Sequence, residues 1–346
     1  MAGVPELGFV IIGAQKAGTT SLFEYLRHHP EIHMPAHKEV GFFSSERNYA
    51  RGWGWYRTVL NEGAPPGTVR GEASVGYMSG TVDRRGAEEM MNPAPPEAPT
   101  EDIVPSRIRE HAPDAKLICV LRDPVARCLS HYRMAVLSRA EKRPFDEVIV
   151  DRLQPAALES ARHEITGNNG YIARGEYHRI LSGFWRAFPP EQLLTLFSSE
   201  LNAHPAEVVS RVCEFVGVDP DYVPSNLEVR YREAALSRRL PNVDLYAWQD
   251  QVSQVTLPRA LWHRLPVGMR RRVDEWYQRA SFRVDVWNAR RGELTPEMPP
   301  HIERRLREHF RPDSLALSEA LGVEVPWLAK WNGKGSLPTG EPANSG

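Results

Sequence analysis

The sequence predicts an α/β fold of three layers, in which helices cover both faces of a central, mostly parallel sheet. Apolar runs typical of buried strands occur at 9–12, 117–121 and 193–197. A helical segment with an apolar face follows each run, and this alternation favours parallel strands that are joined by helices. At 346 residues the chain is long enough to bury a large core.

One domain is predicted over 1–331, with two insertions. Residues 84–105 are rich in Pro, Ala and Glu, a composition that forms no core of its own. Residues 241–295 are rich in aromatic residues and arginine, and they are interpreted as added helices without a chemical role. The tail 332–346 is rich in Gly, Pro and Ser and is predicted to be disordered.

Charge and cysteine content limit the classes of function. The 43 Lys and Arg residues balance 44 Asp and Glu residues, so no global field attracts nucleic acid and any anion site must be local. We expect no transmembrane segment, because no apolar stretch approaches the roughly 18 residues that a membrane helix needs. We also expect no secretory signal, because the N-terminus lacks a basic segment followed by an apolar core and a cleavage site. Three scattered cysteines argue against a disulfide framework and a zinc site and favour a reducing cytoplasm. The oligomeric state stays open.

The first strand leads into a glycine-containing loop that is typical of phosphate-binding sites. The apolar run 9–12 breaks at Gly13, and a helix is predicted to begin near Thr20. Gly13 and Gly18 allow the backbone to turn sharply and approach an anion, while N–H groups of the first helical turn point towards it. Lys16 adds a positive charge within the loop. Hydroxyl donors come from Thr19, Thr20 and Ser21.

The position of the lysine distinguishes two kinds of phosphate site. Gly13 and Gly18 are spaced as in a nucleoside-triphosphate P-loop, so the predicted fold is P-loop-like, but Thr19 stands where a P-loop has its lysine. Because Lys16 lies inside the loop, it favours a compact anion over a triphosphate that extends past the loop with Mg²⁺. The alternative is a tight turn between strand and helix with a solvated lysine.

A second anion-binding element is predicted around Arg122. The run 116–121 is interpreted as a central strand and Asp123 as the cap of helix 125–137. Arg122 then stands at the carboxyl end of the strand and Ser130 lies about two turns along the helix, where the pair could bind a second phosphate. Two alternatives remain: Arg122 could pair with Asp123 at the surface, or Asp123 could hold Mg²⁺ as a Walker-B aspartate.

Two intervening segments carry candidate substrate contacts. Glu39 follows a lysine and precedes Phe42, and this pattern alone also fits a surface turn over a small core. Trp53 begins an aromatic cluster that suits either packing or the wall of a substrate site. Glu72 and Ser74 stand at the end of a further predicted strand, where parallel sheets bind their ligands.

The segment 230–240 carries four arginines, at positions 230, 232, 238 and 239. It is interpreted either as a basic flap over an anionic ligand or as a solvated loop. In the first interpretation Arg238 contacts the ligand.

Two motifs together resemble the sulfotransferases that use 3′-phosphoadenosine 5′-phosphosulfate (PAPS), with the closest likeness to heparan-type carbohydrate sulfotransferases and their bacterial relatives. The loop from Gly13 to Ser21 is similar to the family's 5′-phosphosulfate loop. The segment Leu121-Arg122-Asp123-Pro124, with Arg127, Ser130 and Tyr132, is similar to its 3′-phosphate strand and helix. The resemblance covers about residues 7–225 and returns at 296–331.

The resemblance implies a bacterial enzyme with PAPS as co-substrate and 3′-phosphoadenosine 5′-phosphate (PAP) as product. Lys16 would contact the phosphosulfate, and Arg122 with Ser130 would hold the 3′-phosphate. The acceptor would be a hydroxyl or an amine of a small molecule or a carbohydrate. The 5′-phosphate would be held by Ala17, Gly18, Thr19, Thr20 and Ser21.

The same resemblance implies the catalytic roles. Glu39 falls where heparan-type enzymes carry a catalytic glutamate before paired aromatic residues, and His37 and His33 are the alternative bases. Lys16 would stabilise the departing phosphate oxygen. Near the acceptor, many family members have a lysine where this chain has Ala73, a departure that bears on a heparan-like substrate. The substrate contacts would be Glu72, Ser74, Trp53 and Phe42.

Two other classes of function remain open at this point. A Mg²⁺-dependent kinase of the P-loop class would prefer ATP with Mg²⁺ over PAP. A nucleotide-binding scaffold without catalytic activity would transfer no sulfate to any acceptor. A glutamate and a lysine that converge on one anion site argue against the scaffold.

Overall fold

The computed structural model describes residues 6–36, 38–84, 100–137, 140–164, 169–228 and 298–333. Within these ranges five strands form one sheet in the order β2-β3-β1-β4-β5, and every neighbouring pair is parallel. The α/β fold with a parallel central sheet is therefore confirmed. The strands are β1 (Phe9–Gly13), β2 (Ile32–His33), β3 (Val69–Ala73), β4 (Lys116–Leu121) and β5 (Leu193–Phe197).

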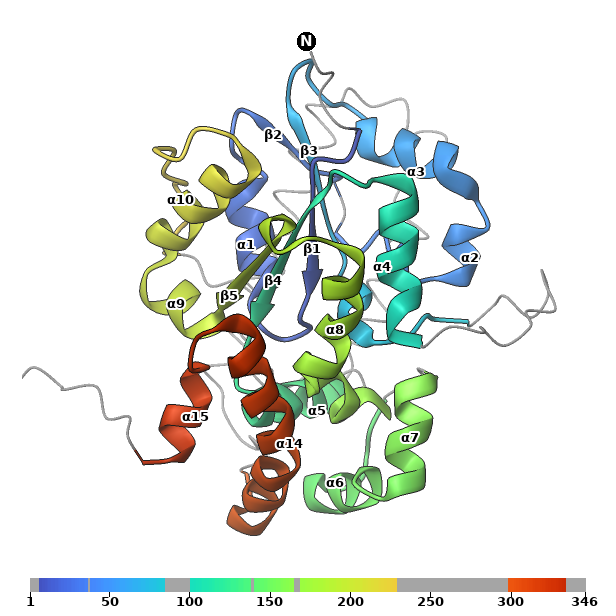
Figure 1. Ribbon diagram of the computed structural model, residues 1–346, viewed down its shortest axis with the longest axis vertical. Helices are drawn as coiled ribbons and strands as arrows, with labels where there is room; N and C mark the ends of the chain where they lie inside the picture. The colour runs from blue at the N-terminus through green and yellow to red at the C-terminus, as the bar shows by residue number, and fades with distance from the viewer. Residues whose placement is uncertain are drawn as a thin grey trace, which may run out of the picture.

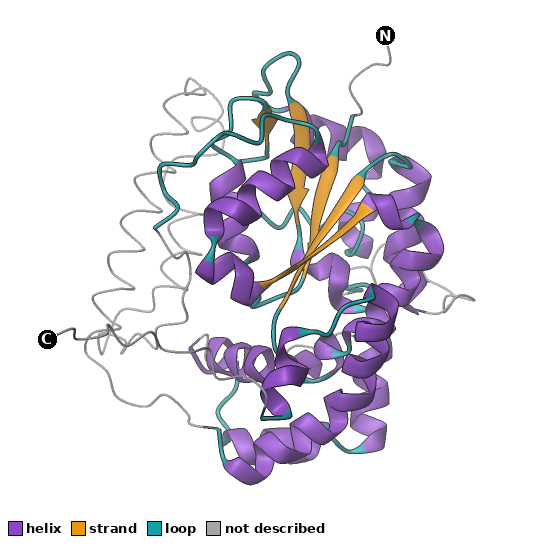
Figure 2. Cartoon of the chain, turned by 60° about the vertical axis from the view of Figure 1, so that its left-hand side comes forward, coloured by secondary structure: helices purple, strands orange, loops and turns teal. Residues whose placement is uncertain are grey.

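Helices flank this sheet, as Figures 1 and 2 show. On one side α4 packs against α8, and on the other α1 lies with α9 and α10 (Figure 1). A further group of helices, with α5, α6, α7, α14 and α15, lies beyond the carboxyl ends of the strands (Figure 1). The bounds are α1 (Thr19–Leu26), α2 (Glu46–Tyr49), α3 (Gly52–Asn61), α4 (Thr100–His111), α5 (Pro124–Leu137), α6 (Phe145–Arg152), α7 (Pro155–His163), α8 (Tyr177–Ala187), α9 (Ser198–Ala203), α10 (Pro205–Val216), α14 (Pro300–Leu321) and α15 (Pro326–Trp331). Short 3₁₀ turns occur at Val75–Ser79, Asn169–Tyr171, Ala173–Gly175 and Pro190–Gln192.

The core is centred on β1 and β4. All five residues of β1 are buried, and in β4 only Lys116 keeps appreciable exposure. Burial on both faces explains why these strands are continuously apolar in the sequence. It also fixes the carboxyl ends of both strands, from which the loops of the site emerge.

Two predicted boundaries differ from the structure. Helix α4 begins at Thr100 and buries Val104, so the last residues of the predicted insertion 84–105 belong to the core. At the C-terminal end, the sequence predicts one helix from His301 into Phe310 and another that carries Leu315 to Leu321, but the structure has a single helix, α14, that continues through Pro312. The carboxylate of Asp313 accepts hydrogen bonds from the backbone N–H groups of His178 (3.1 Å) and Arg179 (3.0 Å), which ties α14 to the start of α8. The other insertion, 241–295, and the tail beyond 333 lie outside the described residues.

Glu176 joins three helices below the sheet. Its buried carboxylate accepts hydrogen bonds from Arg162 of α7 (2.7 Å), Arg179 of α8 (2.7 Å) and His309 of α14 (3.1 Å). Burial alone would raise the pKa of Glu176, but the hydrogen bonds from His309 and Arg162 and the charge of Arg179 outweigh it and lower this pKa to about 2. The carboxylate is therefore strongly stabilised in its charged form.

We expect Glu176→Gln to lower the free energy of unfolding by about 3 kcal/mol at pH 7, since one pKa unit corresponds to about 1.4 kcal/mol. Because the folded-state pKa of Glu176 lies below that of the unfolded chain, this contribution is present above pH 4.5 and is lost as the pH falls towards 2. Urea unfolding at several pH values measures the difference between the two proteins, which should narrow on acidification.

The matched control is Glu159→Gln, which removes an exposed carboxylate that also pairs with Arg162. A surface pair of this kind contributes about 0–1 kcal/mol. Equal stabilities of the Glu176→Gln and Glu159→Gln variants would contradict the structural role of Glu176.

Candidate active site

The loop after β1 has the conformation of an anion-binding turn. Lys16 and Gly18 both adopt positive φ angles, 70° and 103°, and Gly18 caps α1 without a side chain. The first N–H groups of α1 therefore donate no hydrogen bond to a capping side chain, an arrangement that suits a bound anion. In the first turns, Thr19 is buried, while Thr20 and Ser21 are half-buried.

Contacts from distant parts of the chain fix this loop. The guanidinium of Arg122 donates a hydrogen bond to the carbonyl oxygen of Lys16 (3.0 Å), and the hydroxyl of Ser198 donates one to the carbonyl oxygen of Ala17. Arg174 donates to the side chain of Gln15 (2.8 Å). The two predicted anion-binding elements, around Lys16 and around Arg122, are thus brought together at the carboxyl ends of adjacent strands.

Asp123 has the capping role that the sequence predicts. Its Oδ1 accepts hydrogen bonds from the backbone N–H groups of Val125 (2.9 Å) and Ala126 (3.4 Å), and its Oδ2 accepts one from Trp331 Nε1 (3.3 Å). Both oxygens are occupied within the protein, which leaves the Walker-B interpretation without a free carboxylate. Within the described residues, no group of His, Cys, Asp and Glu side chains is arranged to hold a metal ion.

Helix α5 adds the buried positive charge of Arg127, a residue of the predicted 3′-phosphate motif to which sequence reasoning assigned no separate role. Arg127 is fully buried and donates to the carbonyl oxygen of Tyr171, while its Nε and Nη1 atoms have no partner among the described residues. Burial, together with the charges of Arg127, Arg174 and Lys16, lowers the pKa of His131 well below its usual value. Burial also lowers the pKa of Arg122. Ser130, adjacent to His131, is itself buried.

This arrangement favours a bound anion. Arg127 is fully buried, so its nitrogens are not accessible to a ligand in this structure, but its charge adds to those of Lys16 and Arg174 around His131. The residue that sequence reasoning missed is His131, and its i, i+4 spacing from Arg127 on one predicted helix is the signal that could have revealed it.

Glu39 lies in a turn against the end of β3, the strand beside β1. Its backbone N–H donates to the carbonyl oxygen of Ala73 (2.9 Å), and its Oε2 accepts from the N–H of Val75 (2.9 Å). Its Oε1 pairs with the ammonium group of Lys38, and 41% of the Glu39 side chain is exposed. A φ of 69° is unfavourable for a residue with a Cβ and marks a turn whose geometry is imposed by its surroundings.

The predicted substrate contacts differ in their access to solvent. Trp53 is half-buried, whereas Phe42, Glu72 and Ser74 are at most 1% exposed, so direct contact with an acceptor is not available to these three in this structure. Phe42 stacks on Tyr56 with a centroid distance of 4.6 Å. Burial raises the pKa of Glu72 to about 7, although hydrogen bonds, the strongest from Ser74, oppose this rise.

Among the predicted bases and ligands, His37 and Arg238 lie outside the described residues. His33 ends β2, which lies two strands away from β1. Burial is the main cause that lowers the pKa of His33, and the positive charge of Arg70 adds to it. Glu39 is therefore the predicted base that the structure places beside the strand of the anion loop.

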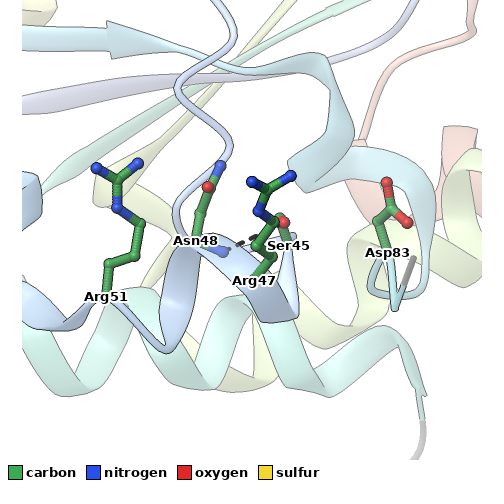
Figure 3. Close-up of a pocket in the computed structure, with 5 residues that line it drawn as sticks. All are labelled: Ser45, Arg47, Asn48, Arg51 and Asp83. Carbon is green, nitrogen blue, oxygen red and sulfur yellow. Dashed lines mark hydrogen bonds between the residues drawn. The ribbon is translucent and has the colours of Figure 1, made fainter. Parts of the chain in front are cut away.

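A polar pocket adjoins the Glu39 turn. Its volume is about 420 Å³, and Figure 3 shows the side chains around it, with two arginines among them. Asn48 connects the pocket to the turn by donating to the carbonyl oxygen of Val40 (2.9 Å). The lining residues are Ser45, Arg47, Asn48, Arg51 and Asp83.

The chain resembles known proteins along most of its length. It is 25% identical over 318 residues to human heparan sulfate glucosamine 3-O-sulfotransferase 3B1, a match that covers 92% of this chain and 64% of that protein. It is 32% identical over 209 residues to the mouse protein of the same name, covering 60% of this chain and 45% of that protein. The chain thus spans less than two thirds of the length of these relatives.

Comparison with solved structures supports the fold. The crystal structure of a sulfotransferase from Alicyclobacillus acidocaldarius superposes with a TM-score of 0.60 and 22% sequence identity, covering 94% of this chain and 98% of that one. No helix among the described residues has the length and apolar character to cross a membrane. A protein-family model described as "Sulfotransferase domain" matches residues 8–281. The family model matches most of the chain, and the order of the parallel strands agrees with this fold. The protein therefore belongs to the sulfotransferase domain family.

Proposed function

We propose that the protein transfers a sulfuryl group from PAPS to an acceptor hydroxyl or amine. The observation that carries the proposal is the convergence of two anion-binding elements, since Arg122 donates directly to the backbone of Lys16. A nucleotide with phosphates at its 3′ and 5′ positions needs two cationic sites of this kind. The charge of the buried Arg127, which acts on His131 together with the charges of Arg174 and Lys16, adds to the positive field at this end of the sheet.

Each residue then has a role that its position allows. The N–H groups at the start of α1, with Thr19, Thr20 and Ser21, would bind the 5′-phosphate, and Arg122 with Ser130 would bind the 3′-phosphate. When bound, PAPS supplies an activated sulfuryl group. Lys16 would offset the negative charge on the departing phosphate oxygen.

Glu39 would act as general base. The acceptor oxygen forms a bond to sulfur as the bond from sulfur to the phosphate oxygen breaks, so the acceptor must lose its proton. Glu39 is partly exposed at the end of β3, where it could take that proton. The loop held by Arg122 and the turn held by residues 73–75 would position the donor and the acceptor for in-line transfer.

The acceptor we propose is a hydroxyl of a carbohydrate or a small molecule. The relatives described above are named as sulfotransferases of glucosamine in heparan sulfate. Trp53 keeps exposed surface beside the Glu39 turn, and a half-buried tryptophan suits a sugar ring or an aromatic acceptor. A heparan-like substrate stays a proposal, because Ala73 replaces the lysine that many family members carry near the acceptor.

We also propose a bacterial protein of the cytoplasm. The three cysteines, Cys119, Cys128 and Cys213, are free and buried, which suits a reducing compartment.

Calorimetric titration with PAP and with ATP plus Mg²⁺ tests the donor. We expect PAP to bind at least about 10-fold more tightly, because ATP lacks the 3′-phosphate that Arg122 would hold, and a charge-assisted contact is worth about 1.5–3 kcal/mol. Preference for ATP with Mg²⁺ would contradict the proposal. Radiolabelled PAPS with a panel of sugars, phenols and aliphatic alcohols then identifies the acceptor class.

A further inference from the structure

We propose that Ser74 and Glu72 are positioning residues that hold the Glu39 turn through a buried hydrogen-bond relay. The proposal rests on the assignment of Glu39 as general base. It gives these two side chains, which are buried and therefore lie away from any acceptor, a defined part in the reaction.

The hydrogen bonds of the relay have one direction when Glu72 is ionised. The backbone N–H of Gly41 donates to Ser74 Oγ (2.8 Å), so the hydroxyl hydrogen of Ser74 is left to donate to Glu72 Oε1. Tyr56 donates its hydroxyl hydrogen to Glu72 Oε2 (3.3 Å). The carboxylate of Glu72 accepts from both sides, and the relay leads from it to the turn.

The turn requires such support. Glu39 and Gly41 both have positive φ angles, 69° and 65°, so the backbone adopts a conformation that only its contacts maintain. Residues 73–75, at the end of β3, provide these contacts. The carbonyl oxygen of Ala73 accepts from the N–H of Glu39, and Ser74 Oγ accepts from the N–H of Gly41. The N–H of Val75 donates to the Glu39 carboxylate. Of these three residues only Ser74 makes its contact through its own side chain, so its contact can be removed without altering the turn residues themselves.

A purely structural role would predict a different result. Ser74 and Glu72 would then contribute to folding as other buried polar groups do, and turnover would change only when the protein unfolds. Ser79 offers the matched comparison: it is a serine of the same region, equally buried, whose hydroxyl bonds only to the carbonyl oxygens of Gly76 and Thr81.

The first test is hydrogen–deuterium exchange, which needs no acceptor. In Ser74→Ala the amide of Gly41 should exchange about 10-fold faster, since it loses its acceptor. Ser74→Thr keeps a hydroxyl and should restore slow exchange, and Ser79→Ala should leave residues 39–41 unchanged. Unchanged exchange at Gly41 in Ser74→Ala would overturn the relay.

The second test is turnover with the best acceptor of the panel. Ser74→Ala should lower kcat about 10-fold or more with an unchanged Kd for PAP, because small misplacements of a catalytic group cost up to about 100-fold. Ser74→Thr should recover most of this loss, and Ser79→Ala should stay close to wild type. An equal loss in Ser74→Ala and Ser79→Ala, or a loss of PAP affinity in Ser74→Ala, would overturn the proposal.

A double-mutant cycle with Glu39→Gln tests the relay separately from the assignment of Glu39 as general base. If Ser74 acts through Glu39, Ser74→Ala should cause no further loss in the Glu39→Gln background. An inactive Glu39→Gln with a fully active Ser74→Ala refutes the relay alone. A fully active Glu39→Gln refutes the assignment of the base, and the relay as a catalytic device with it.

Discussion

Glu39→Gln should lower kcat by about 10²–10⁴-fold while the affinity for PAP stays unchanged, which is the range that a general base contributes. Glutamine keeps the shape of the side chain and can still accept the hydrogen bond from the N–H of Val75. It loses the ability to take a proton from the acceptor. Single-turnover kinetics and calorimetry on the same preparation measure the two quantities.

The control for this variant is Glu62→Gln, which changes an exposed glutamate at the end of α3. It should have wild-type activity. An equal loss of turnover and PAP binding in Glu39→Gln would show that Glu39 supports the structure rather than the chemistry. A fully active Glu39→Gln with an inactive His37→Ala would transfer the role of base to His37.

Lys16→Met should lower kcat by about 10²–10³-fold, the range measured when one group that stabilises developing charge is removed. Methionine approximates the length of the side chain and removes its positive charge. The backbone of the loop is held by Arg122 and Ser198, which bond to carbonyl oxygens and not to the Lys16 side chain, so the loop should keep its conformation. PAPS turnover and the melting temperature together measure the effect.

Lys142→Met, which neutralises an exposed lysine after α5, is the matched control and should have wild-type turnover. Near-normal turnover in Lys16→Met would refute its assignment as the group that stabilises the departing phosphate. Removing this charge should also raise the pKa of His131, because the charge of Lys16 is one of the causes that lower it. Titration by NMR of the His131 ring can follow that change.

Local signals account for the parts of the site that the sequence predicted. The strand before Gly13, the loop to Gly18 and the Asp123 cap depend on residues that are neighbours in the chain, and each is found as predicted. Their physical causes, continuous burial of a central strand and the unpaired N–H groups of a helix start, act over a few residues.

The remainder depends on tertiary contacts. Glu72 and Ser74 stand at a strand end, as predicted, but Tyr56 and the Glu39 turn cover them, and nothing near them in the sequence indicates this burial. Likewise Pro312 suggests a break between two helices, whereas α14 continues through it, and Asp313 ties the helix to the start of α8.

The most direct test of the account is a crystal structure of the protein with PAP. We predict one nucleotide that spans both elements, with its 5′-phosphate against Lys16 and the start of α1 and its 3′-phosphate against Arg122 and Ser130. A structure in which Lys16 and Arg122 face separate cavities, or in which PAP binds away from both, would contradict the account.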